Sequence, residues 1–102
     1  MNRTKPVPNM QAAQLDGSLV AVLERYRLLG YHVDTDAARA QAWDPQARTI
    51  GVAALHQLLA AYWPGVELRV LPFRSVFTAD YRATRLSVHL DQQGRIDRIL
   101  VG

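Results

Sequence analysis

Apolar side chains recur at helical spacing in the first third of the chain. The series consists of Leu19, Val22, Leu23, Tyr26 and Leu29, and this spacing places one apolar face along a helix. Asp16 or Ser18 can accept hydrogen bonds from the first free amides of such a helix, and Gly30 is typical of the position just beyond a helix end. The pattern therefore predicts a helix between Asp16 and Gly30.

A second apolar stripe at helical spacing follows in the middle of the chain. It consists of Val52, Leu55, Leu58, Leu59 and Tyr62. The stripe predicts a helix of about three turns that begins near Thr49 or Gly51 and is closed by Pro64 and Gly65. Because Pro64 limits this uncharged stretch to roughly 13 helical residues, or about 20 Å, it is too short for a bilayer core of about 30 Å. We therefore expect a soluble domain and no membrane partner.

Three later segments alternate between apolar and polar residues, which is the period of a β-strand. These are residues 66–72, 85–91 and 95–101, and residues 92–94 form a turn between the last two. In the first of them Val66, Leu68 and Val70 share one face, and Glu67 and Arg69 share the other.

The region between the two helices is harder to interpret. A short extended piece is expected near residue 31, followed by a possible helical stretch from Asp36 to Trp43 with Thr35 or Asp36 as its cap. Asp44 and Pro45 then break that stretch.

The connection between the first two predicted strands carries both large apolar and charged residues. Residues 70–88 include Phe73, Val76, Phe77 and Tyr81 among three arginines and an aspartate. The connection is too long for a hairpin, whereas parallel neighbours require a long crossover. We therefore expect an α+β domain in which one main helix packs on a small sheet, a long exposed loop joins parallel strands, and an additional helix precedes them.

Composition limits the function classes that need to be considered. The chain has 102 residues, no cysteine, 49% hydrophobic and 21% charged residues, which is the balance of one globular domain. Its net charge is +3, and its 12 basic residues are dispersed, so we expect no nucleic-acid partner. Residues 1–14 have no hydrophobic period and predict a mobile tail. No signal peptide of the usual type is recognisable, so the compartment is undetermined, with the cytoplasm expected unless another export route exists.

Residues capable of catalysis or metal binding are few. His32, Asp34 and Asp36 could form a metal-binding face on an extended segment, but aspartates before an alanine-rich stretch more often cap a helix. We interpret His56 and His89 as solvated surface residues. Trp43 and Trp63 are expected to pack at the edge of the core. No catalytic or phosphate-binding motif is present, so we predict no enzyme activity, no cofactor and no metal site.

From near Trp43 to the end, about half of the chain, the sequence closely resembles the potato inhibitor I family of serine protease inhibitors, which includes eglin and the barley chymotrypsin inhibitors. The residues that carry the resemblance are "VLP" at the end of the first strand, "TADYR" in the loop, Arg85, and the final Val101 and Gly102. A related bacterial and fungal inhibitor family with the same fold is similar in the pair Arg85 and Leu86. The resemblance implies a potato inhibitor I-like domain over residues 46–102, preceded by a helical extension over residues 15–45.

The resemblance also implies a mechanism. In that family the loop enters a protease cleft as an extended, substrate-like segment, which places the reactive bond of this chain between Ala79 and Asp80. The protease-binding residues would be Ser75, Val76, Phe77, Thr78, Tyr81 and Arg82. The small Ala79, where the family usually has leucine or methionine, suits shallow pockets, so the expected partners are subtilisin-like or elastase-like serine proteases.

Family members hold this loop with arginines on the adjoining strand. Arg85 matches the first, and it is expected to serve Thr78, Asp80 and the terminal carboxylate of Gly102. Ser87 stands where the second arginine is found, and Arg74 replaces a glycine that is common at the start of the loop.

An alternative function follows from the missing second arginine. If the loop has lost its rigidity, the domain could keep the inhibitor fold but act as a non-inhibitory interaction domain, with the first helix as its contact surface. Residues 1–45 could equally add a layer to the domain or form a dimerisation element. We expect a monomer more than an oligomer.

Overall fold

The computed structural model describes residues 12–76 and 80–102, and it confirms the α+β class. The elements are α1 (Ala12–Tyr26), β1 (His32–Asp34), the 3-10 helix η1 (Ala37–Arg39), β2 (Trp43–Asp44), β3 (Thr49–Gly51), α2 (Val52–Ala60), β4 (Glu67–Leu71), β5 (Arg85–Leu90) and β6 (Ile96–Val101). The strands form two three-stranded sheets, in the orders β4-β5-β6 and β1-β3-β2.

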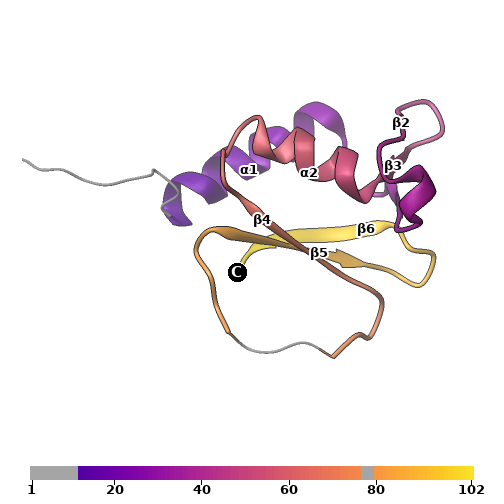
Figure 1. The fold of residues 1–102 in the computed structure, drawn as a ribbon. Coiled ribbons are helices and arrows are strands. Elements are labelled where there is room, and N and C mark those ends of the chain that lie inside the picture. Colours follow the sequence, from indigo (N-terminus) through magenta and orange to yellow (C-terminus); the bar gives the residue numbers. More distant parts are fainter. Residues whose placement is uncertain (1–11, 77–79) are drawn as a thin grey trace, which may run out of the picture.

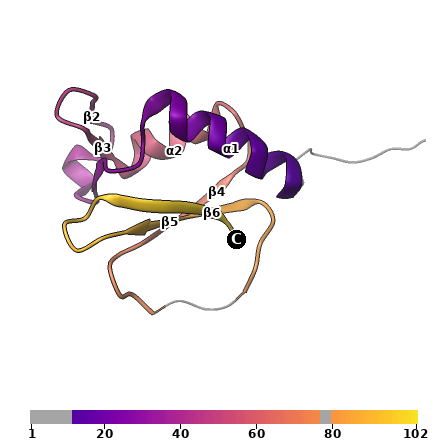
Figure 2. The same ribbon diagram turned by 180° about the vertical axis from the view of Figure 1, so that it is seen from behind.

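The β4-β5-β6 sheet separates the helices from the long loop. Both helices lie on one side of this sheet, and the loop between β4 and β5 extends from the other side (Figure 1). Strand β4 is parallel to β5, which is the pairing that the length of the connection favours, and β6 is antiparallel to β5. Seen from behind, the C-terminal end of β6 lies near the end of the loop that leads into β5 (Figure 2).

Helix α1 differs from its predicted bounds at both ends. It begins at Ala12, so residues 12–14 of the expected tail are helical, and it ends at Tyr26 rather than near Gly30. Arg27 has a φ of +53°, a left-handed conformation that stops a helix. Because the helix ends before Leu28, the next two leucines do not follow the helical period: Leu28 is fully buried, whereas Leu29 is exposed. The predicted position of Leu29 on the apolar face is therefore wrong.

The region before α2 contains more strand and less helix than expected. The extended piece is present as β1, but the stretch from Asp36 to Trp43 is helical only as η1, where the Asp36 side chain accepts a hydrogen bond from the Ala38 amide. Asp36 therefore is a cap, as predicted, but the helix that it caps is a single turn. Strands β2 and β3 were not predicted, because two or three residues are too few to show a period.

Gly51 marks the start of α2, and its backbone is tightly packed. A Cβ atom built on Gly51 would lie 2.3 Å from the main-chain oxygens of Arg39 and Ala40, so no larger residue fits. The same Ala40 oxygen accepts a hydrogen bond from the Ala54 amide, which satisfies one of the free amides in the first turn of the helix. The segment between η1 and β2 thus positions α2.

The first third of the chain shares one core with the rest. Hydrogen bonds join Gly30 to Ile96 and Val33 to Gly94, so the segment around β1 pairs with the start of β6. The core also contains side chains from both halves of the chain; its members include Leu19, Val22, Leu28, Tyr31, Val33, Leu55, Leu59, Trp63, Leu86, Val88 and Ile99. The residues before α2 therefore form part of a common core.

Candidate functional site: the loop between β4 and β5

The described parts of the loop present apolar side chains to solvent. Val76 is 99% exposed and Tyr81 is 62% exposed, and Phe73 is also exposed. Leu71, at the end of β4, is buried. Neighbouring large apolar groups in contact with water are unfavourable for an isolated domain and are common where a protein binds a partner.

The first turn of the loop has a backbone conformation that suits glycine, although this chain has an arginine there. Arg74 stands where the resembled family commonly has glycine, and its φ is +60°, in the left-handed region that glycine adopts without strain. The turn is closed by a 3.0 Å hydrogen bond from the Ser75 amide to the Pro72 oxygen. The Arg74 guanidinium lies 5.1 Å from the centre of the Phe73 ring, a cation–π contact that offsets part of the strain.

Arg85, the first residue of β5, connects the far end of the loop to the end of β6. One of its terminal nitrogens donates hydrogen bonds to the main-chain oxygens of Asp80, at 2.5 Å, and Gly102, at 2.6 Å. Its Nε donates a second bond to the Gly102 oxygen at 3.0 Å. The Arg85 side chain is only 11% exposed. Its bonds to Gly102 are partly buried, which strengthens them, whereas its bond to Asp80 is exposed.

A second arginine, Arg69 on β4, reaches the same two residues. Its guanidinium lies 3.6 Å from the Asp80 carboxylate and donates a 3.4 Å hydrogen bond to the Gly102 oxygen. Its Nε donates a 3.2 Å bond to the hydroxyl of Ser87. These contacts are longer than the bonds of Arg85 to the main-chain oxygens, so each is individually weaker than those bonds. Asp80 nevertheless lies between two guanidinium groups.

Ser87 and Gly102 act as fixed acceptors beneath the loop. Ser87 is 3% exposed and is the direct neighbour of Arg69 in the parallel pairing of β4 with β5. Gly102 is held to β5 by a 2.7 Å hydrogen bond from its amide to the Arg85 oxygen. A Cβ atom at Gly102 would lie 3.1 Å from the Tyr81 ring, so the glycine allows this loop residue to approach closely.

Sequence reasoning missed Arg69, although it identified Ser87 as the place of an absent arginine. The signal is the register of the parallel strands: once Arg69 is opposite Ser87, both side chains lie on the face that supports the loop. A long side chain on β4 can therefore reach the position that an arginine at residue 87 would occupy.

An exposed ion pair joins the two ends of the same region. The Arg82 guanidinium donates a 2.7 Å hydrogen bond to the carboxylate of Glu67, the first residue of β4. Both side chains are about half exposed, so this pair contributes little stability, on the order of 0–1 kcal/mol. The more buried bonds of Arg85 to main-chain oxygens contribute more to holding the loop.

The expected reactive bond lies partly outside the described residues. Phe77, Thr78 and Ala79 fall in the gap between residues 76 and 80, so the predicted contact between Arg85 and Thr78 is also outside them. Asp80, Tyr81 and Arg82 are described, and so are Ser75 and Val76 before the gap. What the structure brings together is Asp80 with Arg69, Arg85 and Gly102.

His89 lies on the loop side of the sheet and is half-buried, so its interpretation as a solvated residue is wrong. It pairs with Leu71 on β4 and with Arg98 on β6. Burial lowers the pKa of His89 below its ordinary value, and the nearby charges of Arg98 and Arg69 lower it further. The neutral form of the imidazole is therefore favoured beside the two arginines.

The other residues considered for chemistry have structural partners. The Asp34 carboxylate accepts hydrogen bonds from the Asp36 amide and from Arg39, and these bonds lower the pKa of Asp34. Among the described residues, no group of three possible ligands could hold a metal ion, and no helix is long and apolar enough to cross a membrane. His56 is exposed and lies 2.8 Å from the Val66 oxygen.

The two tryptophans differ. Trp63 is buried and belongs to the core. Trp43 is 39% exposed, and it contacts the Tyr26 ring edge-on with the ring centres 6.1 Å apart. Packing at the edge of the core therefore describes Trp63 better than Trp43.

Comparison with known proteins gives an informative similarity among solved structures. No protein-family model matches the sequence, and no curated protein matches it significantly. Among solved structures, the chain is similar to the elastase inhibitor AFUEI, with a TM-score of 0.50 and 18% sequence identity, over 90% of this chain and 100% of that chain. This coverage is more than residues 46–102 alone can account for, so the similarity includes part of the preceding region. At this level of identity the likeness concerns the fold, and the chain shares its fold with that elastase inhibitor.

Proposed function

We propose that this protein is a serine protease inhibitor that presents the loop between β4 and β5 to the protease as a substrate-like segment. The reactive bond would join Ala79 to Asp80, as the resemblance to the potato inhibitor I family implies. The targets would be elastase-like or subtilisin-like enzymes, because Ala79 offers only a methyl group to the primary pocket. The catalytic serine belongs to the protease, and this chain contributes no catalyst.

The observation that carries the proposal is the convergence of Arg85 and Arg69 on Asp80. A loop can inhibit rather than serve as a substrate only if it stays in place while bound. Holding the main-chain oxygen of Asp80 at 2.5 Å from Arg85 would fix the residue directly after the proposed reactive bond. Preorganisation of this kind saves about 0.5–1.5 kcal/mol for each side chain that does not have to be immobilised on binding.

The same contacts would oppose completion of the cleavage reaction. If the protease cuts the bond, the new amino group belongs to Asp80, whose carboxylate and main-chain oxygen contact Arg69 and Arg85. An amine held in place has a high effective concentration, so re-formation of the peptide bond competes with hydrolysis. The protease would then remain occupied by an intact or slowly exchanging inhibitor.

Arg69 also bears on the alternative of a non-inhibitory interaction domain. That alternative rests on a loop without a second supporting arginine, and Arg69 contributes a second guanidinium from the neighbouring strand. The shared fold with an elastase inhibitor supports the same choice. We therefore favour the inhibitor.

Titration of the purified protein against subtilisin, elastase and chymotrypsin tests the proposal. Tight inhibition of elastase or subtilisin, with chymotrypsin weaker, is expected. Rapid degradation by all three enzymes, or no binding, would favour the non-inhibitory domain.

The substitution Ala79→Leu tests the position of the bond in the same assay. Each buried methylene group contributes about 0.8 kcal/mol, so chymotrypsin and subtilisin should be inhibited at least about tenfold more tightly. Ala61→Leu, an exposed position at the end of α2, adds the same side chain away from the loop and should change neither constant. Equal inhibition by the parent and Ala79→Leu would argue against this reactive bond.

A further inference from the structure

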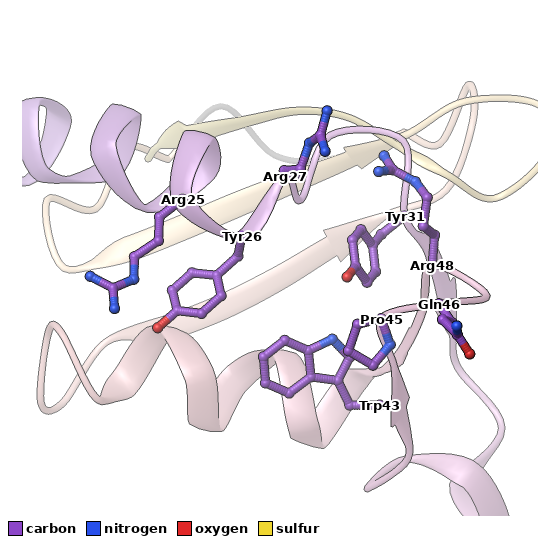
Figure 3. Close-up of a pocket in the computed structure, with 8 residues that line it drawn as sticks. All are labelled: Arg25, Tyr26, Arg27, Tyr31, Trp43, Pro45, Gln46 and Arg48. Atoms are coloured by element: carbon purple, nitrogen blue, oxygen red, sulfur yellow. The ribbon is translucent and has the colours of Figure 1, made fainter.

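A second surface with binding features lies between the end of α1 and the turn that connects β2 to β3. It is a cavity of about 560 Å³, within the size range of ligand-binding clefts. Its lining residues are Arg25, Tyr26, Arg27, Tyr31, Trp43, Pro45, Gln46 and Arg48 (Figure 3).

Aromatic rings form an apolar wall in this cavity. The Tyr26 ring meets the Trp43 indole edge-on, and the Tyr26 hydroxyl lies 2.8 Å from the hydroxyl of Tyr62. These contacts hold Tyr26 in position. Trp43, in contrast, is on a two-residue strand and leaves 39% of its surface exposed, so an apolar group from a partner could bury it.

Positive charge borders the aromatic wall at two separate places. Arg25 lies 5.6 Å from the centre of the Tyr26 ring at one end of the group, whereas the guanidinium groups of Arg27 and Arg48 lie on the other side of Tyr26, toward Tyr31, and the Arg27 side chain points away from Trp43 (Figure 3). Arg48 is fixed there by a 2.5 Å hydrogen bond to the Leu29 oxygen and by a 5.2 Å contact with the Tyr31 ring.

These positive charges are not balanced within the cavity. None of the described residues that line it is acidic. Arg27 is exposed, and its positive φ turns the chain away from the helix axis directly after the end of α1. A ligand with negative charge at both ends would therefore complement the cavity.

We propose that this cavity is a second binding site, which takes an acidic peptide segment of a partner protein with carboxylates on both sides of an apolar side chain. The apolar side chain would pack on Trp43 and Tyr26, and the carboxylates would pair with Arg25 at one end and with Arg27 and Arg48 at the other. Guanidinium groups suit carboxylates because both are planar and can form two parallel hydrogen bonds. The spacing of the charges around an apolar centre favours a peptide over a compact anion, which would need the arginines to converge.

The cavity can be occupied while the loop is bound to a protease. Helix α1 lies on the side of the β4-β5-β6 sheet opposite to the loop in both views (Figures 1 and 2). The site is therefore independent of the proposed inhibitory function, and it would allow the protein to be attached to a partner while it inhibits.

Binding of a synthetic peptide, acetylated and amidated at its ends, with the sequence Glu-Glu-Phe-Leu-Glu-Glu, tests the proposal. Titration calorimetry should detect binding of this peptide. Tryptophan fluorescence should change as well, because Trp43 is exposed in the free protein whereas Trp63 is buried. A peptide with lysine in place of glutamate, and one with serine in place of the apolar pair, should bind weakly or not at all. Raising the salt concentration to about 1 M should strongly weaken binding of the acidic peptide.

Variants locate the site. Arg25→Gln combined with Arg27→Gln should raise the dissociation constant of the acidic peptide about tenfold, since the loss of each exposed ion pair changes a binding constant by a few-fold. Trp43→Ala should weaken peptide binding further. Trp43→Phe, which keeps an aromatic ring, should weaken binding less, and it controls for disruption of the β1-β3-β2 sheet. Arg98→Gln removes a charge on the loop side of the sheet, where Arg98 pairs with His89, and should leave peptide binding unchanged.

Several results would overturn the proposal. They are equal binding of the acidic and the lysine peptides, peptide affinity unchanged in the folded double arginine variant, or no binding of the acidic peptide at low salt. A single-stranded oligonucleotide that binds more tightly than the peptide and displaces it would assign the cavity to another class of partner. Protease inhibition by the double arginine variant should equal that of the parent, which separates this site from the loop.

Discussion

Two adjacent residues of β5 face opposite sides of the main sheet and are held in different ways. Leu86 is fully buried in the core that the helices cover, whereas Arg85 uses charged hydrogen bonds to hold Asp80 and Gly102 beneath the loop. The helix side is stabilised by the burial of apolar surface, which has no directional requirement. The loop side depends on the directions and spacing of a few polar groups. The fold should therefore tolerate changes that disable the loop, and the following predictions test this difference.

The largest effect on stability should come from the helix side. Leu86→Ala removes a fully buried side chain and should lower the free energy of unfolding by about 2–5 kcal/mol. Leu100→Ala, on the exposed side of β6 opposite Ser87, should lower it by less than about 1 kcal/mol. Chemical denaturation measures both. Similar losses in the two variants would contradict the assignment of the core to the helix side.

The largest effect on inhibition should come from Arg85. Arg85→Gln removes charge-assisted hydrogen bonds to two main-chain oxygens; the partly buried bond to Gly102 is worth about 1.5–3 kcal/mol, and the exposed bond to Asp80 is worth less. Inhibition of the most sensitive protease should weaken by at least about tenfold, and cleavage in the loop should accelerate. The loss of stability should be smaller than in Leu86→Ala. Arg98→Gln, which removes the same charge on β6, should inhibit normally; equal losses in both arginine variants would point to net charge instead of loop support.

Arg69 should have a similar but smaller effect, because its contacts are longer. Arg69→Gln should weaken inhibition by about threefold to tenfold, as expected when longer hydrogen bonds and a partly exposed ion pair are lost. Ser87→Ala removes one acceptor of Arg69 and should lie between this variant and the parent. Inhibition constants for the three proteins decide the order. If Arg69→Gln inhibits as the parent does, Arg69 does not replace the second arginine of the resembled family.

The smallest effect should be a dependence of stability on pH that arises from His89. Its pKa in the folded protein is below the ordinary value of 6.5, so the unfolded chain binds a proton more readily. The free energy of unfolding should therefore decrease as the pH falls from 6.5 toward the lower pKa of the folded state, and then level off. The free energy of unfolding of His89→Gln, measured by chemical denaturation at several pH values, should change less across this window. A profile parallel to that of the parent would exclude His89 as the source.

The sequence predicted the elements with a strong hydrophobic period and missed those defined by single residues. Helix α2 and strands β4, β5 and β6 follow from such periods. The end of α1 does not, because Arg27 adopts a left-handed conformation that its residue type does not favour. Strands β2 and β3 are held by pairing across the chain, which a pattern of two or three residues cannot reveal.

The loop support was predicted in part for a related reason. Arg85 and Gly102 could be identified from the resemblance, because each matches a position in the family's pattern. Arg69 could not, since its role depends on the register that places it opposite Ser87, and no hairpin turn fixes the register of two strands that are joined by a long connection. The exposed wall around Trp43 was missed in the same way: Tyr26 and Trp43 are distant in sequence and meet only in the folded chain.

A time course of cleavage by subtilisin or elastase, followed by mass spectrometry, tests the central claim most directly. The protein should be cut slowly and at one bond, between Ala79 and Asp80, while the mixture continues to inhibit the protease; the combined Arg69→Gln and Arg85→Gln variant should be cut there rapidly and lose inhibition. Slow first cleavage at another bond, or rapid degradation of the parent with no inhibition, would contradict the account of a loop held by two arginines.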